Sequence, residues 1–209
     1  MIWNDRTQAG KELSAKLTEY SGQKDAIILG LPRGGVVVAY EVAKSLKLPL
    51  DIVITRKIGA PDNPELAIAA IDETGEGVYN EPLVQYTDAT NEYLMAKIEE
   101  EKEEIRRRKE LYRKNKPPLD LRHKVAIIVD DGIATGYTVS AAARFCRSEG
   151  ASKIVIAVPV VAFDSLSILK DLAEDVIYLD APENFGSVGQ FYERFGQVTD
   201  EEVIKFLNR

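Results

Sequence analysis

Two adjacent acidic residues, Asp130 and Asp131, have the clearest capacity for chemistry in this chain. They directly follow five apolar residues, Val125 to Val129, whose length and β-branched content predict a fully buried strand. Two ionised carboxylates side by side repel each other, so a fold keeps them adjacent only where donors lie nearby. Those donors would be the hydroxyls of a polyol, a divalent cation with its waters, or the N–H groups of the following turn.

A short loop of small and hydroxyl residues follows the acids and leads into a predicted helix over residues 138–149. Thr135, Gly136 and Thr138 offer hydroxyl groups and an unobstructed backbone. The start of a helix adds free N–H groups and the positive end of its dipole, which suit an anion. Carboxylates at the end of a parallel strand lie where open α/β sheets bind ligands. Acids for a polyol beside a loop for a phosphate indicate a site for a sugar phosphate.

The segment Val129–Thr138, Val-Asp-Asp-Gly-Ile-Ala-Thr-Gly-Tyr-Thr, resembles the phosphoribosyl pyrophosphate (PRPP) motif of the type I phosphoribosyltransferases. The resemblance implies that Asp130 and Asp131 hold the 2′- and 3′-hydroxyls of the ribose and contact Mg²⁺ only through water or those hydroxyls. It also implies that the 5′-phosphate binds a loop made of Ala134, Thr135, Gly136, Tyr137 and Thr138. Ala134 departs from the pattern, because many members carry Ser or Thr there, so a hydroxyl contact is missing.

A second loop supports this interpretation. A buried strand is predicted over residues 26–31, and Pro32, Arg33, Gly34 and Gly35 follow it. The family has a similar loop that binds pyrophosphate and commonly holds a non-proline cis peptide, so the resemblance places Arg33, Gly34 and Gly35 at the pyrophosphate. A surface salt bridge is the alternative for Arg33. A dinucleotide-binding turn is disfavoured, because the glycine spacing is G-x-x-x-G-G and Pro32 lies inside the turn.

Two basic residues, Arg56 and Lys57, end the next predicted strand, which spans residues 50–55. They precede a loop rich in glycine and proline, where basic side chains are well placed for a polyphosphate. The family carries a mobile loop in this region that closes over PRPP. The resemblance therefore makes Lys57 a candidate catalytic residue and Arg56 a candidate substrate-binding residue, with a solvated surface pair as the alternative.

The elements that position these residues alternate between strand and helix. Further strands are predicted over 124–130, 154–160 and 176–179, with helices over 5–20, 36–46 and 163–173. This rhythm is typical of α/β proteins. We expect a mostly parallel twisted sheet flanked by helices, the type I phosphoribosyltransferase fold, with a small hood over the site.

Residues 72–118 depart from the alternation of strand and helix. They are predicted to be an insertion, a hairpin followed by a long helix, within a single domain of residues 1–209. The hairpin would pair residues 78–79 with 83–84, next to a strand at 66–71.

The long helix is predicted over 89–116, with Glu103 and Glu104 spaced to pair with Arg107 and Arg108. Its narrow apolar stripe favours a surface helix across the core; an arm for self-association as a homo-oligomer, or a cover over the active site, is the alternative.

Composition excludes several classes. The net charge of −7 argues against nucleic acid as the main partner. Cys146 is the only cysteine and is predicted to be a buried structural thiol, which excludes an intramolecular disulfide and agrees with a reducing cytoplasm. Neither a signal peptide nor a membrane span is visible, so we expect a cytoplasmic protein with no membrane partner.

The resemblance implies a glycosyltransferase of the pentosyltransferase type that acts in nucleotide metabolism. PRPP would donate its phosphoribosyl group to a small-molecule nitrogen acceptor such as a nucleobase, with Mg²⁺ as cofactor and pyrophosphate as product. Asp131, the acid nearer the phosphate loop, is the candidate for taking a proton. A non-catalytic regulatory protein that binds PRPP is the alternative, and no residue pattern identifies the acceptor.

Overall fold

The computed structural model describes residues 1–114 and 116–209. Its centre is a five-stranded parallel sheet in the order β2 (Leu50–Ile52), β1 (Ala26–Gly30), β6 (Val125–Val129), β7 (Lys153–Val160) and β8 (Asp175–Asp180). The chain runs from β1 to β2 on one side and later pairs β6 on the other side of β1. The loops that leave β1 and β6 therefore lie at a topological switch point, where open α/β sheets bind ligands.

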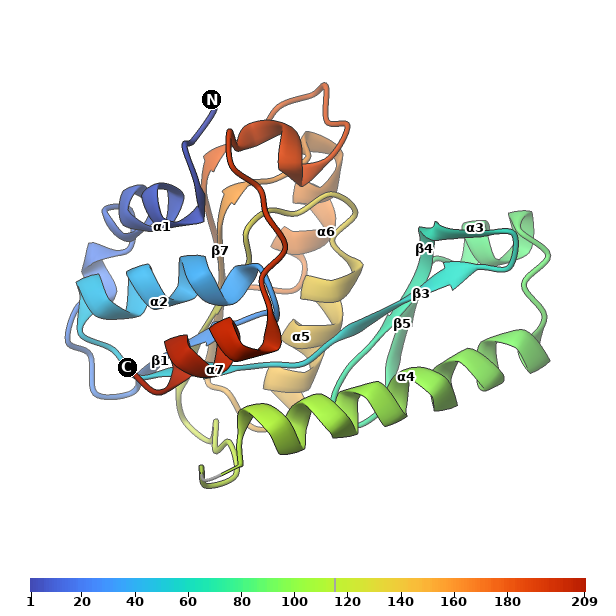
Figure 1. Ribbon diagram of the computed structural model, residues 1–209, viewed down its shortest axis with the longest axis horizontal. Helices are drawn as coiled ribbons and strands as arrows, with labels where there is room; N and C mark the ends of the chain where they lie inside the picture. The colour runs from blue at the N-terminus through green and yellow to red at the C-terminus, as the bar shows by residue number, and fades with distance from the viewer. Residues whose placement is uncertain (115) are drawn as a thin grey trace.

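Helices cover both faces of this sheet (Figure 1). One face carries α1 (Arg6–Ser14) and α2 (Gly35–Leu46), and the other carries α5 (Tyr137–Ser148) and α6 (Leu166–Lys170). The predicted fold class, a mostly parallel sheet flanked by helices, is confirmed. The first helix is shorter than expected, because it ends at Ser14 and a single 3₁₀ turn follows at Thr18–Tyr20.

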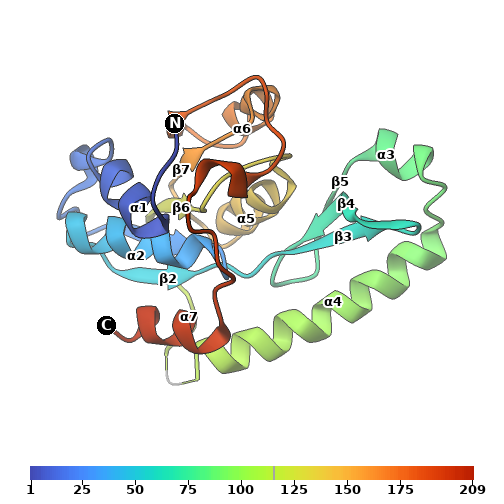
Figure 2. The same ribbon diagram turned by 45° about the horizontal axis from the view of Figure 1, so that its top comes forward.

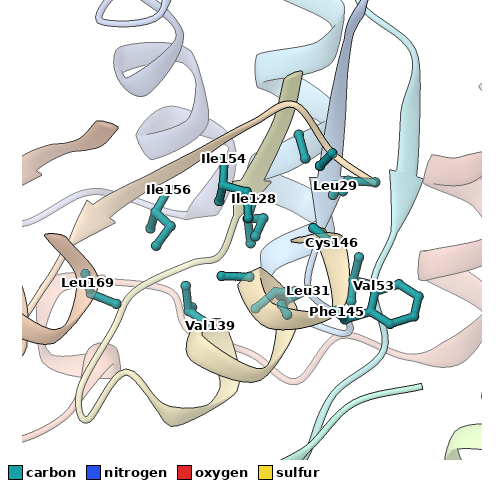
Figure 3. Packing of buried hydrophobic residues seen from close by; sticks show 14 of the residues in the cluster. Leu29, Leu31, Val53, Ile128, Val139, Phe145, Cys146, Ile154, Ile156 and Leu169 are labelled. Atoms are coloured by element: carbon teal, nitrogen blue, oxygen red, sulfur yellow. The ribbon is translucent and has the colours of Figure 1, made fainter. Parts of the chain in front are cut away.

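The core lies on both sides of β1 and β6, whose side chains are all buried. Successive residues of a strand point to opposite faces. Leu29 and Ile128 pack on the α5 face with Cys146 (Figure 3), and Ile28 and Ile127 pack on the α1–α2 face. Cys146 is fully buried, and this burial raises the pKa of its thiol, as expected for a structural cysteine.

A second, antiparallel sheet projects from this core (Figures 1 and 2). It contains β3 (Arg56–Ala60), β4 (Asn63–Ile71) and β5 (Gly77–Tyr79), and it is followed by α3 (Glu81–Tyr86) and α4 (Asn91–Tyr112). The strand predicted at 66–71 is therefore present within β4, but it belongs to this sheet. We call these five elements the arm.

The hairpin predicted around Asn80 is wrong. The side chain of Asn80 accepts a hydrogen bond from the N–H of Leu83 and caps α3, which has Pro82 in its first turn. Proline is favoured in the first turn of a helix, because the N–H it lacks has no partner there. That residues 72–118 form an insertion in a single domain stays a prediction.

The long charged helix is present as α4. Leu94, Ile105 and Tyr112 are buried in one apolar cluster with residues of the arm's sheet and with Val203 and Leu207, which confirms the narrow apolar stripe. The helix was predicted to continue to residue 116, and residue 115 lies outside the described residues. Within the described residues, no helix combines the length and the apolarity that a membrane span requires.

One of the two ion pairs predicted along α4 is confirmed. Glu104 pairs with Arg108 at 2.7 Å as expected. Glu103 pairs with Arg106 rather than Arg107, whose guanidinium instead contacts Glu104 and Asp200.

The N-terminal segment meets a late segment of the chain, around residues 188–192, beside the central sheet (Figure 1). Trp3 packs against a tail that contains the 3₁₀ helix Val188–Phe191, with its ring centre 5.6 Å from that of Tyr192. We call Trp3 and residues 188–196 the hood. That the hood covers a bound acceptor stays a prediction. The last helix, α7 (Asp200–Leu207), then returns along α2 and α4.

Candidate active site

Asp130 and Asp131 lie directly beyond β6, opposite the loop that leaves β1. A Cβ on Gly35 would lie 2.6 Å from Oδ1 of Asp130, and a Cβ on Gly34 would overlap Oδ2 of Asp131. No residue with a side chain fits at either glycine without displacing a carboxylate. The two glycines therefore let both acids pack against the loop predicted to hold pyrophosphate.

The two acids have different electrostatic surroundings. Burial, and then repulsion by Asp131, raise the pKa of Asp130 well above its usual range, although Lys57 acts in the opposite direction. Asp131 instead receives a hydrogen bond at Oδ2 from Nε of Arg6, at 2.7 Å. Protonation of Asp130 would relieve its buried charge. The expected role of Asp131 in taking a proton stays a prediction.

The loop after the acids is built to receive an anion. Gly136 has a φ of 81°, in the left-handed region that favours glycine, and α5 begins at the next residue. Within the described residues, the backbone N–H groups of residues 134–138 donate to no protein acceptor. Ser165 holds the loop from behind by donating to the carbonyl of Ala134 at 2.6 Å. Unpaired N–H groups beside a helix N-terminus suit a phosphate.

A cavity of about 260 Å³ joins these groups. Among the predicted site residues, it is lined by Lys57, Asp130, Asp131, Ala134, Thr135, Gly136 and Thr138. Tyr137 is not among them, because its side chain lines a different hollow beside Asn80. The sequence did not single out three further lining residues, Thr55, Val188 and Phe195.

The predicted basic residues Arg33, Arg56 and Lys57 differ in what they contact. The Pro32–Arg33 peptide bond is cis, as the resemblance implied, and Pro32 lines the cavity. Nη1 of Arg33 lies 3.8 Å from Oδ1 of Asp200, a long ion pair. Arg56 is engaged more closely, because its Nε donates to Glu101 of α4 at 2.5 Å. Lys57 is thus at the cavity, while the role of Arg56 toward a polyphosphate stays a prediction.

Two residues that hold Asp131 were missed by sequence reasoning. Arg6 contacts its carboxylate, and the hydroxyl of Tyr192 donates to its backbone carbonyl at 2.6 Å. Both lie far away in the chain, so no local motif contains them. Nothing in the sequence near Arg6 indicated a site.

Comparison with known proteins places the chain in a family. The model of the phosphoribosyl transferase domain matches residues 2–193. The crystal structure of TT1426 from Thermus thermophilus has a TM-score of 0.80 and 40% identity, covering 99% of this chain and 98% of that one. The purine phosphoribosyltransferase of Pyrococcus horikoshii, with 21% identity, a TM-score of 0.50 and coverage of 88% and 87%, shares the fold.

A curated protein of Mycobacterium tuberculosis, named "Putative phosphoribosyl transferase", is 43% identical over 208 residues. The match covers 100% of this chain and 47% of that protein, so the chain spans about half the length of this relative. The family match nevertheless extends over nearly all of the chain described here, including both acids and the loop after them. The chain belongs to the phosphoribosyl transferase family.

Proposed function

We propose that this chain transfers the 5-phosphoribosyl group of PRPP to a nitrogen acceptor, a nucleobase, and releases pyrophosphate. The observation that carries the proposal is one cavity bordered by a carboxylate pair, a loop of unpaired N–H groups and Lys57. These groups match the three chemical parts of PRPP, which are a ribose diol, a 5′-phosphate and a pyrophosphate. Family membership supports the same reaction class, pentosyl transfer.

Each part of the donor has its own protein groups in this proposal. Asp130 and Asp131 accept hydrogen bonds from the ribose hydroxyls, and the N–H groups of residues 134–138 with the Thr135 and Thr138 hydroxyls hold the 5′-phosphate. Arg33 and Lys57 face the pyrophosphate. The long contact of Arg33 with Asp200 leaves that guanidinium free to turn toward an anion.

The reaction replaces one bond at the anomeric carbon. The carbon–oxygen bond to pyrophosphate breaks with its electron pair on the leaving oxygen. The acceptor nitrogen forms the new bond and passes its proton to Asp131, the candidate base. Positive charge develops on the ribose in between, and the carboxylates of Asp130 and Asp131 stabilise it. Arg33 and Lys57 stabilise the negative charge that accumulates on pyrophosphate.

Magnesium fits this site as a partner of the substrate. Within the described residues, no group of three or more His, Cys, Asp or Glu side chains could hold a metal ion. Mg²⁺ keeps several waters and needs few protein ligands, so the oxygens of PRPP would bind it, with Asp130 and Asp131 contacting it through water. When bound, it would neutralise charge on the leaving group.

The acceptor would approach from the side of the hood. Val188 and Phe195 line the cavity there, and both are apolar. An apolar wall with an aromatic ring supports a flat heterocycle as acceptor, since such rings stack. The single, buried cysteine agrees with the reducing cytoplasm as the place of this reaction.

The test is release of pyrophosphate from PRPP and Mg²⁺ in the presence of single purine and pyrimidine bases, with the nucleotide product identified by mass spectrometry. We expect release with at least one base. Tight binding of PRPP without release for any base would contradict the transferase and favour a regulatory PRPP-binding protein.

The site assignment has its own variants. Asp130→Asn combined with Asp131→Asn should abolish binding of PRPP while the protein stays folded, because neutral amides lose the charge-assisted hydrogen bonds to the ribose. The matched control is Asp120→Asn, at an exposed carboxylate whose ion-pair partner within the described residues is Arg122. Undiminished binding by the double variant would refute the assignment.

A further inference from the structure

Arg6, the first residue of α1, contacts two separate parts of the site. Its Nε donates to Oδ2 of Asp131 at 2.7 Å, and its Nη1 donates to the carbonyl of Gly196 at 2.9 Å. Its guanidinium carbon lies 3.8 Å from the centre of the Phe195 ring. Stacking and directed hydrogen bonds together fix the plane of a guanidinium, which a lysine ammonium cannot reproduce.

The ion pair between Arg6 and Asp131 is shielded from water. Only 11% of the Arg6 side chain and 14% of the Asp131 side chain are exposed. Exposed ion pairs contribute little, but a shielded, hydrogen-bonded pair holds its geometry more firmly. Arg6 also places a positive charge beside two adjacent carboxylates that would otherwise repel each other.

The start of α1 is itself held in place. Asp5 caps the helix by accepting from the N–H of Gln8 at 3.0 Å. Gly10 lies so close to α2 that a Cβ there would be 2.9 Å from the carbonyl of Val38. The close packing of α1 on α2 therefore sets the position of Arg6.

The ion pair between Arg6 and Asp131 is bounded on its other side by residues 32–35, the loop proposed to hold pyrophosphate. A Cβ on Gly34 would lie 3.0 Å from Nε of Arg6 and would overlap the Asp131 carboxylate. Tyr192 holds the backbone of the same residue by donating to its carbonyl. Oδ2 of Asp131 is thus engaged by Arg6, whereas no N–H or O–H group of the described residues donates to its Oδ1.

We propose that Arg6 is a positioning residue that holds Asp131 with Oδ1 turned toward a ribose hydroxyl of PRPP. It also links this acid to Gly196 and to Phe195, which lines the cavity on the proposed acceptor side. The inference rests on the proposed function, because it assumes that the acids bind ribose. A plain anchor for the N-terminus is the competing role, and the two roles differ in which ligands they affect.

The experiment measures the affinities of PRPP and of pyrophosphate by calorimetry, each with Mg²⁺, for the wild type and Arg6→Gln. PRPP should bind about ten-fold more weakly or worse to Arg6→Gln, a change of about 1.4 kcal/mol. Pyrophosphate should bind Arg6→Gln nearly as well as the wild type, because Arg33 and Lys57 contact it directly and Asp131 reaches it only through the waters of Mg²⁺. A structural defect would lower both affinities or neither.

Two further variants sharpen the test. Arg194→Ala is the matched control, since this arginine pairs with Asp5 in the same region while 75% of its side chain is exposed, and its affinities should equal those of the wild type. In combination with Asp131→Asn, Arg6→Gln should cause little further loss, because the two residues act as a unit. If Arg6→Gln does not fold, Arg6→Lys replaces it. This variant should lose less affinity for PRPP than expected for Arg6→Gln and none for pyrophosphate.

The outcomes separate the two proposals. PRPP affinity within two-fold of the wild type in a folded Arg6 variant would overturn the role of Arg6 and leave the proposed function standing. Equal losses for PRPP and pyrophosphate would also overturn it, in favour of a plain anchor. A wild-type protein that binds no PRPP would contradict the proposed function itself, and the role of Arg6 with it.

Discussion

Asp130 is a charged residue in a place that disfavours its charge. Its carboxyl packs against Gly35, and burial and the neighbouring Asp131 raise its pKa. A substitution that removed the charge would relieve this cost, but it would also remove an acceptor for the ribose. The residue therefore trades stability for binding, a compromise common at functional sites.

The variant Asp130→Asn should accordingly be more stable than the wild type at neutral pH. The pKa of Asp130 is raised in the folded protein, so its ionisation lowers the free energy of unfolding as the pH rises through that pKa. Thermal unfolding at several pH values should give the variant a higher Tm at pH 7, with the difference shrinking as the pH falls. Asp120→Asn should gain nothing, because Arg122 lowers the pKa of that carboxyl. A lower Tm for Asp130→Asn at pH 7 would contradict the argument.

Much of the site could be predicted at this scale, because its centre is continuous in sequence. The acids and the loop over residues 134–138 lie at one strand end, and the spacing of their types already indicates a sugar phosphate. Arg6 could not be found in this way, because it is 125 residues from Asp131 and only the packing of α1 on α2 brings it there. The pairing of Arg56 with Glu101 could not be predicted either, because 45 residues separate the two and only tertiary packing brings them together.

At the scale of elements, α4 is attached to the core by a buried ionic cluster at its carboxyl end. Arg113 donates to Glu73 at 2.8 Å and to Asp51 at 3.2 Å, with 7%, 1% and 14% of the three side chains exposed. It also donates to the carbonyl of Ile52. One side chain thus joins the helix, the turn after β4 and the edge strand β2.

Arg113→Met should therefore destabilise the protein by about 3 kcal/mol, because removing one partner leaves the others buried with uncompensated charge. Lys109, 3.0 Å from Glu73, limits the loss. Urea unfolding measures the difference. Arg122→Met, which breaks an exposed pair, should stay within about 0.5 kcal/mol of the wild type. Similar values for both variants would show that burial of the cluster does not matter.

Element prediction succeeded where periodicity was strong and failed where a short segment had two interpretations. The central strands β1 and β6 are continuous apolar runs, and α4 has a clear charge pattern. Residues 81–86 were different, since Val and Tyr favour strands while Asn80, Glu81 and Pro82 form a helix start. Packing of the partly buried Leu83 and Val84 against apolar residues of the arm's sheet decides in favour of the helix.

At the scale of the whole molecule, segments far apart in the chain enclose one cavity. The loop after β1, the loop after β6 and the hood meet at one edge of the sheet, while the arm extends away from it (Figure 2). Arg6 and Tyr192 connect the hood to Asp131. A ligand that engages Asp131 should therefore stabilise the hood as well as the loops that it touches.

Hydrogen exchange with PRPP and Mg²⁺ tests this linkage. With ligand at about 100 times its Kd, exchange that requires ligand release should slow about 100-fold. We expect this protection at residues 32–35 and 134–138, and also at 192–196 in the hood, whereas residues 94–105 of α4 should exchange as before. In Arg6→Gln, at the same saturation, protection at 192–196 should be lost while that at 134–138 persists, because the phosphate loop binds its ligand without help from Arg6. Protection confined to residues 134–138 in the wild type would mean that the hood is independent of the donor site.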